Sequence, residues 1–225
     1  MRRLHWRTRA YGRTIGQELA AFGIDLCFAP VLDLDHGVST IIGDRAFADR
    51  SELVVELARE FRAGLNAAGM AATGKHFPGH GAVRADSHVE LPVDRRPESE
   101  LRAQDLLPFR SLVADGLESI MMAHVRYTAV DETPASLSRK WIRDILRHEL
   151  GFGGAVFCDD LSMGGAAVAG TMEERARLAL AAGCDMLPVC NDRVAVVGLL
   201  DALKDLKPNR AASTRLKRLY LRAVE

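Results

Sequence analysis

Residues 69–76 read Gly-Met-Ala-Ala-Thr-Gly-Lys-His, a glycine followed by a short, mostly apolar run that ends in two basic side chains. The same unit, a helical stretch that ends in glycine and leads into an apolar strand, occurs five times in the chain. Glycine suits the position after a helix because it adopts a left-handed conformation without a clash of Cβ. The predicted strands are residues 24–31, 70–74, 119–124, 155–158 and 184–189, after Gly23, Gly69, Gly116, Gly151 and Gly183.

The segments between these strands carry the marks of helices. Apolar side chains recur every four residues from Leu53 to Leu65, as an amphipathic helix requires. Thr171 and Glu174 have the spacing of a capping box, which predicts that a helix begins there. Further helices are predicted over residues 100–115, 138–150 and 193–206.

Alternating strands and helices predict an α/β fold with a parallel sheet. The strands are nearly continuous apolar runs, which is typical of strands covered on both faces. An open doubly wound sheet and a closed barrel both fit. Polar residues follow four successive strands, which favours a (β/α)8 TIM-barrel type, yet five units are three short of eight. Spacing alone leaves both architectures open. No Pro/Gly/Ser-rich linker divides the chain, so residues 1–225 are predicted to form one domain.

The composition argues against several classes of partner. Thirty basic residues balance thirty acidic ones, so no overall field favours nucleic acid or anionic lipid. The basic cluster between Arg2 and Arg13 is interpreted as a solvated helix face rather than a nucleic-acid arm. No apolar run approaches the roughly 18 residues of a membrane span, and the N-terminus lacks the apolar core of a signal peptide. The four cysteines fall in strand-like runs without a C-x-x-C pair, which predicts reduced, buried thiols and a cytoplasmic location.

Reactive side chains gather in three segments. The first is Lys75-His-Phe-Pro-Gly-His-Gly81, which leads into Asp86-Ser-His88 in a long loop. The second is Asp159-Asp-Leu-Ser-Met163 at a strand end, and the third is Ile42-Gly-Asp-Arg-Ala-Phe47. No G-x-G-x-x-G or G-x-x-x-x-G-K-[ST] follows any strand, which argues against a nucleotide site.

These segments, together with Phe28-Ala-Pro-Val-Leu-Asp33, resemble in sequence and order the bacterial β-N-acetylhexosaminidases of glycoside hydrolase family 3. The resemblance extends over nearly the whole chain. It implies the (β/α)8 barrel, of which the five visible units would be the last five. It also implies a cytoplasmic enzyme that removes N-acetylglucosamine from 1,6-anhydro-N-acetylmuramic acid fragments during cell-wall recycling, without metal or cofactor.

The resemblance also implies roles for individual residues. Asp159 would be the nucleophile that forms a covalent glycosyl-enzyme, and His88 would be the acid/base. Asp86 would hold the His88 imidazole in one tautomer. Arg45, Lys75 and His76 would bind the hydroxyls of the sugar. The chemistry agrees, because a retaining glycosidase needs an ionised nucleophile and a proton donor on the other side of the bond, and imidazole exchanges protons near neutral pH.

Each of these readings has a simpler alternative. Asp159 and Asp160 could cap the next helix, and the choice between them as nucleophile rests on the resemblance. His76, His80 and His88 do not have the spacing of a compact zinc site. Ser87 is flanked by Asp86 and His88, but adjacent residues of one loop cannot readily form a catalytic triad, and no G-x-S-x-G elbow is present.

The chain departs from the family pattern at its start. The first three βα units, with a usual Asp-Gln-Glu-Gly-Gly-Arg segment that grips the terminal sugar, have no equivalent before residue 24. The function is therefore predicted as a glycosidase acting on a small aminosugar or muropeptide, or as a non-catalytic remnant. A glycoside phosphorylase is the third alternative. The full-length family is expected to be monomeric, whereas open sheet edges could associate in this chain.

Overall fold

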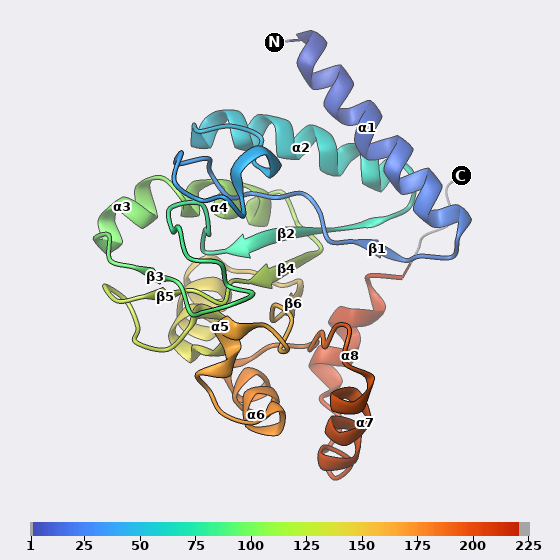
Figure 1. Cartoon of the computed structure of the whole chain (residues 1–225). Coiled ribbons are helices and arrows are strands. Elements are labelled where there is room, and N and C mark those ends of the chain that lie inside the picture. Colours follow the sequence, from blue (N-terminus) through green and yellow to red (C-terminus); the bar gives the residue numbers. More distant parts are fainter. Residues whose placement is uncertain (1, 221–225) are drawn as a thin grey trace.

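The computed structural model describes residues 2–220, which form a row of parallel strands with helices packed beside it. Strands β1 (Leu26–Cys27), β2 (Ala71–Phe77), β4 (Ser119–Met122) and β6 (Ala155–Phe157) pair in that order (Figure 1). A parallel bridge between Phe157 and Met186 adds a fifth position. The sheet therefore follows the order of the chain, and the predicted α/β fold with a parallel sheet is confirmed.

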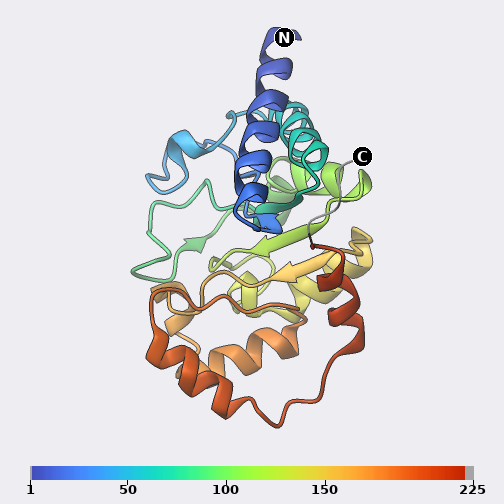
Figure 2. The same cartoon turned by 90° about the vertical axis from the view of Figure 1, so that its right-hand side faces the viewer.

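Helices occupy most of the segments between the strands. They are α1 (Arg2–Ala21), α2 (Ser51–Ala67), α3 (Glu98–Ala103), α4 (Leu106–Ala114), α5 (Gly164–Ala167), α6 (Met172–Ala182), α7 (Arg193–Ala202) and α8 (Arg210–Lys217), with the π-helix η3 (Lys140–Glu149) and the short 3-10 turns η1 (Gly43–Arg45) and η2 (Ala135–Leu137). In Figure 2, α1 and α2 lie at one end of the row of strands, and α6 and α7 lie at the other.

The two faces of the sheet differ in what covers them. In β4, Ile120 and Met122 belong to the large apolar core shared with α2, α4, η3 and α6. Met121 points to the other face, in a small cluster with Phe157 and Leu219. Alternate side chains thus divide between an outer layer covered by helices and a sparsely filled inner face, which is the arrangement of a barrel wall.

The five predicted glycines all occupy the left-handed region. The φ angles of Gly23, Gly69, Gly116, Gly151 and Gly183 are 72°, 77°, 80°, 70° and 123°. The capping box before α6 is also present: the Thr171 side chain accepts the Glu174 N–H, and the Glu174 side chain accepts the Thr171 N–H. These local predictions are confirmed.

Three element boundaries differ from the prediction. The helix predicted over residues 100–115 is broken between α3 and α4, because Pro108 has no N–H to donate to the Gln104 carbonyl, which instead accepts the Ser51 hydroxyl at 3.0 Å. The strand predicted at 24–31 shrinks to the two residues of β1 and an isolated bridge at Val31, and the strand predicted at 184–189 shrinks to a single bridge at Met186. Pro30 and Pro188 interrupt these segments, because a proline cannot donate to a strand ladder.

Helix α1 carries the basic cluster of the N-terminus. Arg3, Arg7, Arg9 and Arg13 are exposed, which confirms the solvated face for these four side chains. Trp6 and Tyr11 are exposed beside them, so the face is mixed rather than polar. Within residues 2–220, none of the helices combines the length and apolar character needed to cross a membrane.

Two short strands form a second sheet among the loops that follow the main strands. β3 (Val93–Asp94) pairs in parallel with β5 (Arg126–Tyr127). The buried Tyr127 hydroxyl donates a hydrogen bond of 2.7 Å to the Gly79 carbonyl. This contact ties the turn of the Lys75–Gly81 segment to the second sheet, close to the predicted site.

Candidate active site

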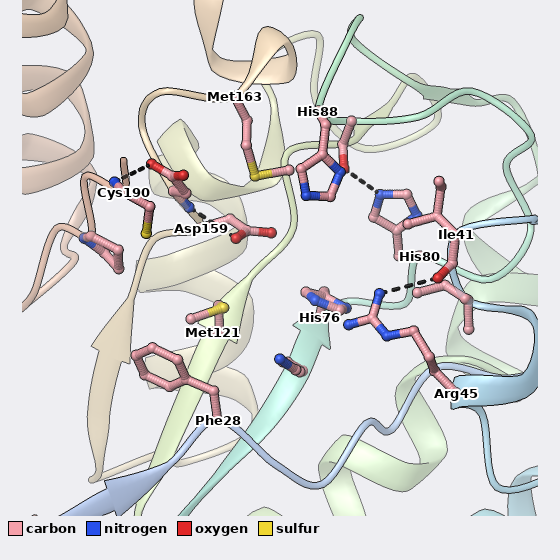
Figure 3. Close-up of a pocket in the computed structure, with 15 residues that line it drawn as sticks. Phe28, Ile41, Arg45, His76, His80, His88, Met121, Asp159, Met163 and Cys190 are labelled. Carbon is pink, nitrogen blue, oxygen red and sulfur yellow. Dashed lines mark hydrogen bonds between the residues drawn. The ribbon is translucent and has the colours of Figure 1, made fainter. Parts of the chain in front are cut away.

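A cavity of about 210 Å³ opens at the carboxyl ends of β2, β4 and β6 (Figure 3). Five of the six predicted site residues line it: Arg45, Lys75, His76, His88 and Asp159. The sixth, Asp86, is hydrogen bonded to His88. Strand β2 and the loops after β1, β2 and β6 therefore bring together residues that are more than 100 positions apart in the sequence.

Asp159 directly follows β6 and the buried Cys158, and its carboxylate points into the cavity (Figure 3). Its Oδ1 accepts the backbone N–H of Asp160 at 2.8 Å. Burial disfavours the ionised carboxylate, but His76, His124 and Lys75 attract it and hold the pKa of Asp159 below its ordinary value. Asp159 is therefore an anion at neutral pH, as a nucleophile must be.

The neighbouring carboxylate of Asp160 serves the backbone instead. Oδ1 accepts the N–H groups of Ser162 at 2.9 Å and Cys190 at 3.0 Å, and Oδ2 accepts the Ser162 hydroxyl at 2.7 Å. These bonds fix the turn after β6 to the segment after Met186. The two adjacent aspartates thus have different environments, and Asp159 is the one free to meet a substrate.

His88 and Asp86 form a hydrogen-bonded pair on the loop between β2 and β3. The Nδ1 atom of His88 lies 2.8 Å from Asp86 Oδ1, which also accepts the His88 backbone N–H at 2.8 Å. The backbone N–H and then the ring of His88 lower the pKa of Asp86. The His88 side chain is 62% exposed and lines the cavity. The pair has the orientation of an imidazole held by a carboxylate.

Two cationic side chains approach the cavity, Arg45 from the loop after β1 and Lys75 from β2. Arg45, in η1, donates from Nη1 to the Ile41 carbonyl at 3.1 Å (Figure 3). Lys75 is half-buried, and burial followed by the charge of Arg45 lowers its pKa. Both groups can donate hydrogen bonds to sugar hydroxyls.

Asp33 belongs to the site in the structure but was not among the site residues predicted from the sequence. Its buried carboxylate lies 2.7 Å from His76 Nδ1 and accepts the backbone N–H groups of His76 and His80. Burial disfavours the ionised form, but His76 and His80 hold the pKa of Asp33 below its ordinary value. The position of Asp33 at the end of a predicted strand could have marked it as a candidate site residue. Its contact with His76, however, depends on how two strands pair, which the sequence does not show.

His80 and Ser87 also join the site without having been assigned to it. Their side chains share a hydrogen bond of 3.0 Å, and both residues line the cavity. Burial lowers the pKa of His80. His124, in contrast, is fully buried beneath the site, where Nε2 donates to the Asp160 carbonyl at 2.9 Å and Nδ1 contacts the Ser136 hydroxyl.

The cysteines only partly follow the sequence-based expectation. Cys158 and Cys184 are buried free thiols, and Cys27 is half-buried. Cys190 is exposed and lines the cavity, so the prediction of burial was wrong for this residue. Pro188 ends the apolar run before it, and the chain leaves the sheet. In residues 2–220, no group of three His, Cys, Asp or Glu side chains is placed to hold a metal ion.

The family model of the glycosyl hydrolase family 3 N-terminal domain matches residues 6–220. The chain belongs to glycosyl hydrolase family 3. A beta-hexosaminidase of Methylococcus capsulatus is 53% identical over 205 residues, which cover 91% of this chain and 61% of that protein. A beta-hexosaminidase of Alkalilimnicola ehrlichii is 54% identical over 213 residues, which cover 95% of this chain and 61% of the relative.

Solved structures of the family give the same picture. NagZ of Neisseria gonorrhoeae, in complex with N-trifluoroacetyl-D-glucosamine, has a TM-score of 0.90 and 43% identity over 96% of this chain and 62% of that chain. The fold is therefore of the TIM-barrel type, incomplete in this family 3 chain, and the choice of a barrel over a doubly wound sheet is confirmed. The chain spans about 61% of the length of the curated relatives it matches.

Proposed function

We propose that this chain carries the reaction centre of a retaining β-N-acetylglucosaminidase, with Asp159 as nucleophile and His88 as acid/base. The observation that carries the proposal is that Asp159 and His88, the latter held by Asp86, line one cavity. A buried, ionised carboxylate and an exposed imidazole are the two groups that a two-step displacement requires.

The proposed reaction has two steps. In the first, Asp159 attacks the anomeric carbon while His88 donates its proton to the leaving oxygen, so the glycosidic bond breaks and a glycosyl ester forms. In the second, neutral His88 removes a proton from water, which attacks the anomeric carbon and releases Asp159 as a carboxylate. Asp86 stabilises the imidazolium that forms on His88 in this step.

The other lining residues would select and orient the sugar. Arg45, Lys75 and His76 meet in the cavity and would donate hydrogen bonds to the hydroxyls of N-acetylglucosamine. The leaving group would be an anhydro-N-acetylmuramic acid fragment, with or without peptide, in cell-wall recycling. We propose that residues 1–225 act as one catalytic domain of this enzyme. Its binding partner would be the small-molecule substrate. The free thiols of the chain agree with a cytoplasmic location.

Turnover of p-nitrophenyl N-acetyl-β-glucosaminide by the 225-residue chain tests the proposal. A 5-fluoro glycosyl fluoride should label Asp159, as found by mass spectrometry of the digested protein, and Asp159→Asn should abolish turnover and labelling. Asp160→Asn is the matched control, since it should keep the label wherever the protein folds. A folded wild-type chain without turnover would contradict the proposal and favour a non-catalytic protein. The position of β1 at the edge of the sheet is the observation that favours this alternative. Release of the sugar 1-phosphate in phosphate buffer would instead indicate a phosphorylase.

A further inference from the structure

Two consecutive glycines lie shortly after Asp159, at the start of α5, and they contact the loop that carries His88. The backbone N–H of Gly164 donates to the His88 carbonyl at 2.9 Å, and that of Gly165 donates to the Ser87 carbonyl at 2.8 Å. The first N–H groups of a helix have no partner within the helix, so they are available to an outside acceptor. Here both acceptors come from the segment that holds the candidate acid/base.

The contact is too close for any side chain at these positions. A Cβ on Gly164 would lie 2.2 Å from the carbonyl oxygen of Val89 and 2.3 Å from its carbonyl carbon. A Cβ on Gly165 would lie 2.9 Å from His124 Cβ and 3.1 Å from the Ser87 carbonyl oxygen. These obstacles are mostly backbone, so one of the two segments would have to move.

Ser87 is the buried point of an otherwise exposed stretch. It is 2% exposed, and its hydroxyl shares the 3.0 Å hydrogen bond with His80, which is also 2% exposed. The flanking Asp86 and His88 side chains are 37% and 62% exposed. His80 is fixed in turn, because its backbone N–H donates to Asp33 at 2.7 Å. The loop is therefore held at Ser87 while the two functional side chains beside it stay open to a substrate.

We propose that Gly164 and Gly165 are positioning residues that dock the Asp86–His88 loop onto the segment of Asp159, with Ser87 and His80 as the side-chain part of the same contact. The inference rests on the proposed function for the role of His88. Docking sets the separation between the Asp159 carboxylate and the His88 imidazole, and retaining glycosidases need their nucleophile and acid held at a fixed, short separation. Misplacement by about 1 Å can cost on the order of 100-fold in rate.

Hydrogen–deuterium exchange tests the docking without any need for activity. Gly164→Ala and Gly165→Ala should speed exchange on the order of tenfold or more, both at the amides of residues 164 and 165, which donate the two docking bonds, and in residues 84–90, since the loop that supplies the acceptors is released. Gly153→Ala is the matched control, because a Cβ there meets nothing within 4 Å. Ser87→Ala, which leaves the backbone unchanged, should raise exchange in the same segment and serves where a glycine variant does not fold. Exchange in both glycine variants equal to that in Gly153→Ala would overturn the inference.

Kinetics with two leaving groups test the consequence for the acid. A 2,4-dinitrophenyl leaving group departs without a proton, whereas the second sugar of chitobiose needs one. Gly164→Ala and Ser87→Ala should lower kcat/KM for chitobiose on the order of tenfold more than kcat/KM for the dinitrophenyl glycoside, because kcat/KM reports the first step, in which only chitobiose needs the proton of His88. Equal losses for both substrates would overturn the positioning role. If the wild type turns over neither substrate, the proposed function fails, while the exchange experiment still decides the docking.

Discussion

Asp33 and His76 form a buried contact that joins the segment after β1 to the end of β2, directly beside the cavity. One carboxylate oxygen lies 2.7 Å from Nδ1 of His76, and the same carboxylate accepts the backbone N–H groups of His76 and His80. His76 faces the cavity next to Asp159 (Figure 3). Asp33 therefore fixes the ring of His76, a candidate sugar-binding residue, and the backbone of His80, which also lines the cavity.

Asp33→Asn should destabilise the protein by about 3 kcal/mol, because the buried His76 loses its charged partner and an amide cannot replace all of the carboxylate's acceptor bonds. Urea unfolding at pH 7 measures the change. Asp35→Asn is the control: Asp35 is exposed and accepts the nearby Gly37 N–H, so we expect a change within about 0.5 kcal/mol. Equal stability of the two variants would contradict the structural role of Asp33.

Local features of the fold could be predicted from the sequence because each depends on a few adjacent residues. Gly69 and Gly151 require a backbone conformation that other residues avoid, and this requirement places the start of the following strand. The pair Thr171 and Glu174 defines a helix start through its own hydrogen bonds. The break at Pro108 was also encoded locally, but the apolar period on either side of it suggested one continuous helix.

The long-range contacts of the site could not be predicted in the same way. The Asp33–His76 contact forms because β1 and β2 are neighbours in register, which no spacing in the sequence reports. The docking of Gly164 onto the carbonyl of His88 likewise joins two loops with different parent strands. Motif resemblance suggested roles for Asp159 and His88, but it does not identify the residues that hold them in place.

The buried His124 should make the protein less stable as the pH is lowered. Burial lowers the pKa of His124 in the folded protein, so below pH ~6.5 the unfolded chain binds a proton that the native state does not. The free energy of unfolding should therefore be at its highest value above pH ~6.5 and should decrease as the pH falls below that value. His80 adds to the same trend.

Urea unfolding at pH 7.5 and 5.5 measures this difference, and His124→Gln should reduce it. The same variant costs stability at pH 7.5, by about 1–3 kcal/mol, because it disturbs the bonds to Ser136 and the Asp160 carbonyl. His148→Gln, at an exposed position, should retain the wild-type difference. A wild-type protein with equal stability at both pH values would refute the prediction.

Tyr127→Phe should destabilise the protein by about 1–2 kcal/mol, because the buried Gly79 carbonyl loses the hydroxyl that donates to it at 2.7 Å. The ring itself remains packed against Trp141, so the loss of the hydrogen bond is isolated from a loss of packing. Chemical denaturation measures the effect. Tyr11→Phe, on the exposed face of α1, is the control and should change stability by less than about 0.5 kcal/mol.

Asp86→Asn should slow catalysis while leaving sugar binding nearly intact. An asparagine amide can still meet His88 Nδ1, but it carries no charge to stabilise the imidazolium, and it no longer fixes which ring nitrogen bears the proton. We therefore expect kcat to fall on the order of 100-fold or more, with KM little changed, for a substrate whose leaving group needs protonation. Glu90→Gln, an exposed change in the same loop, should keep wild-type kinetics. If Asp86→Asn raised KM and left kcat unchanged, Asp86 would act in substrate binding and not through His88.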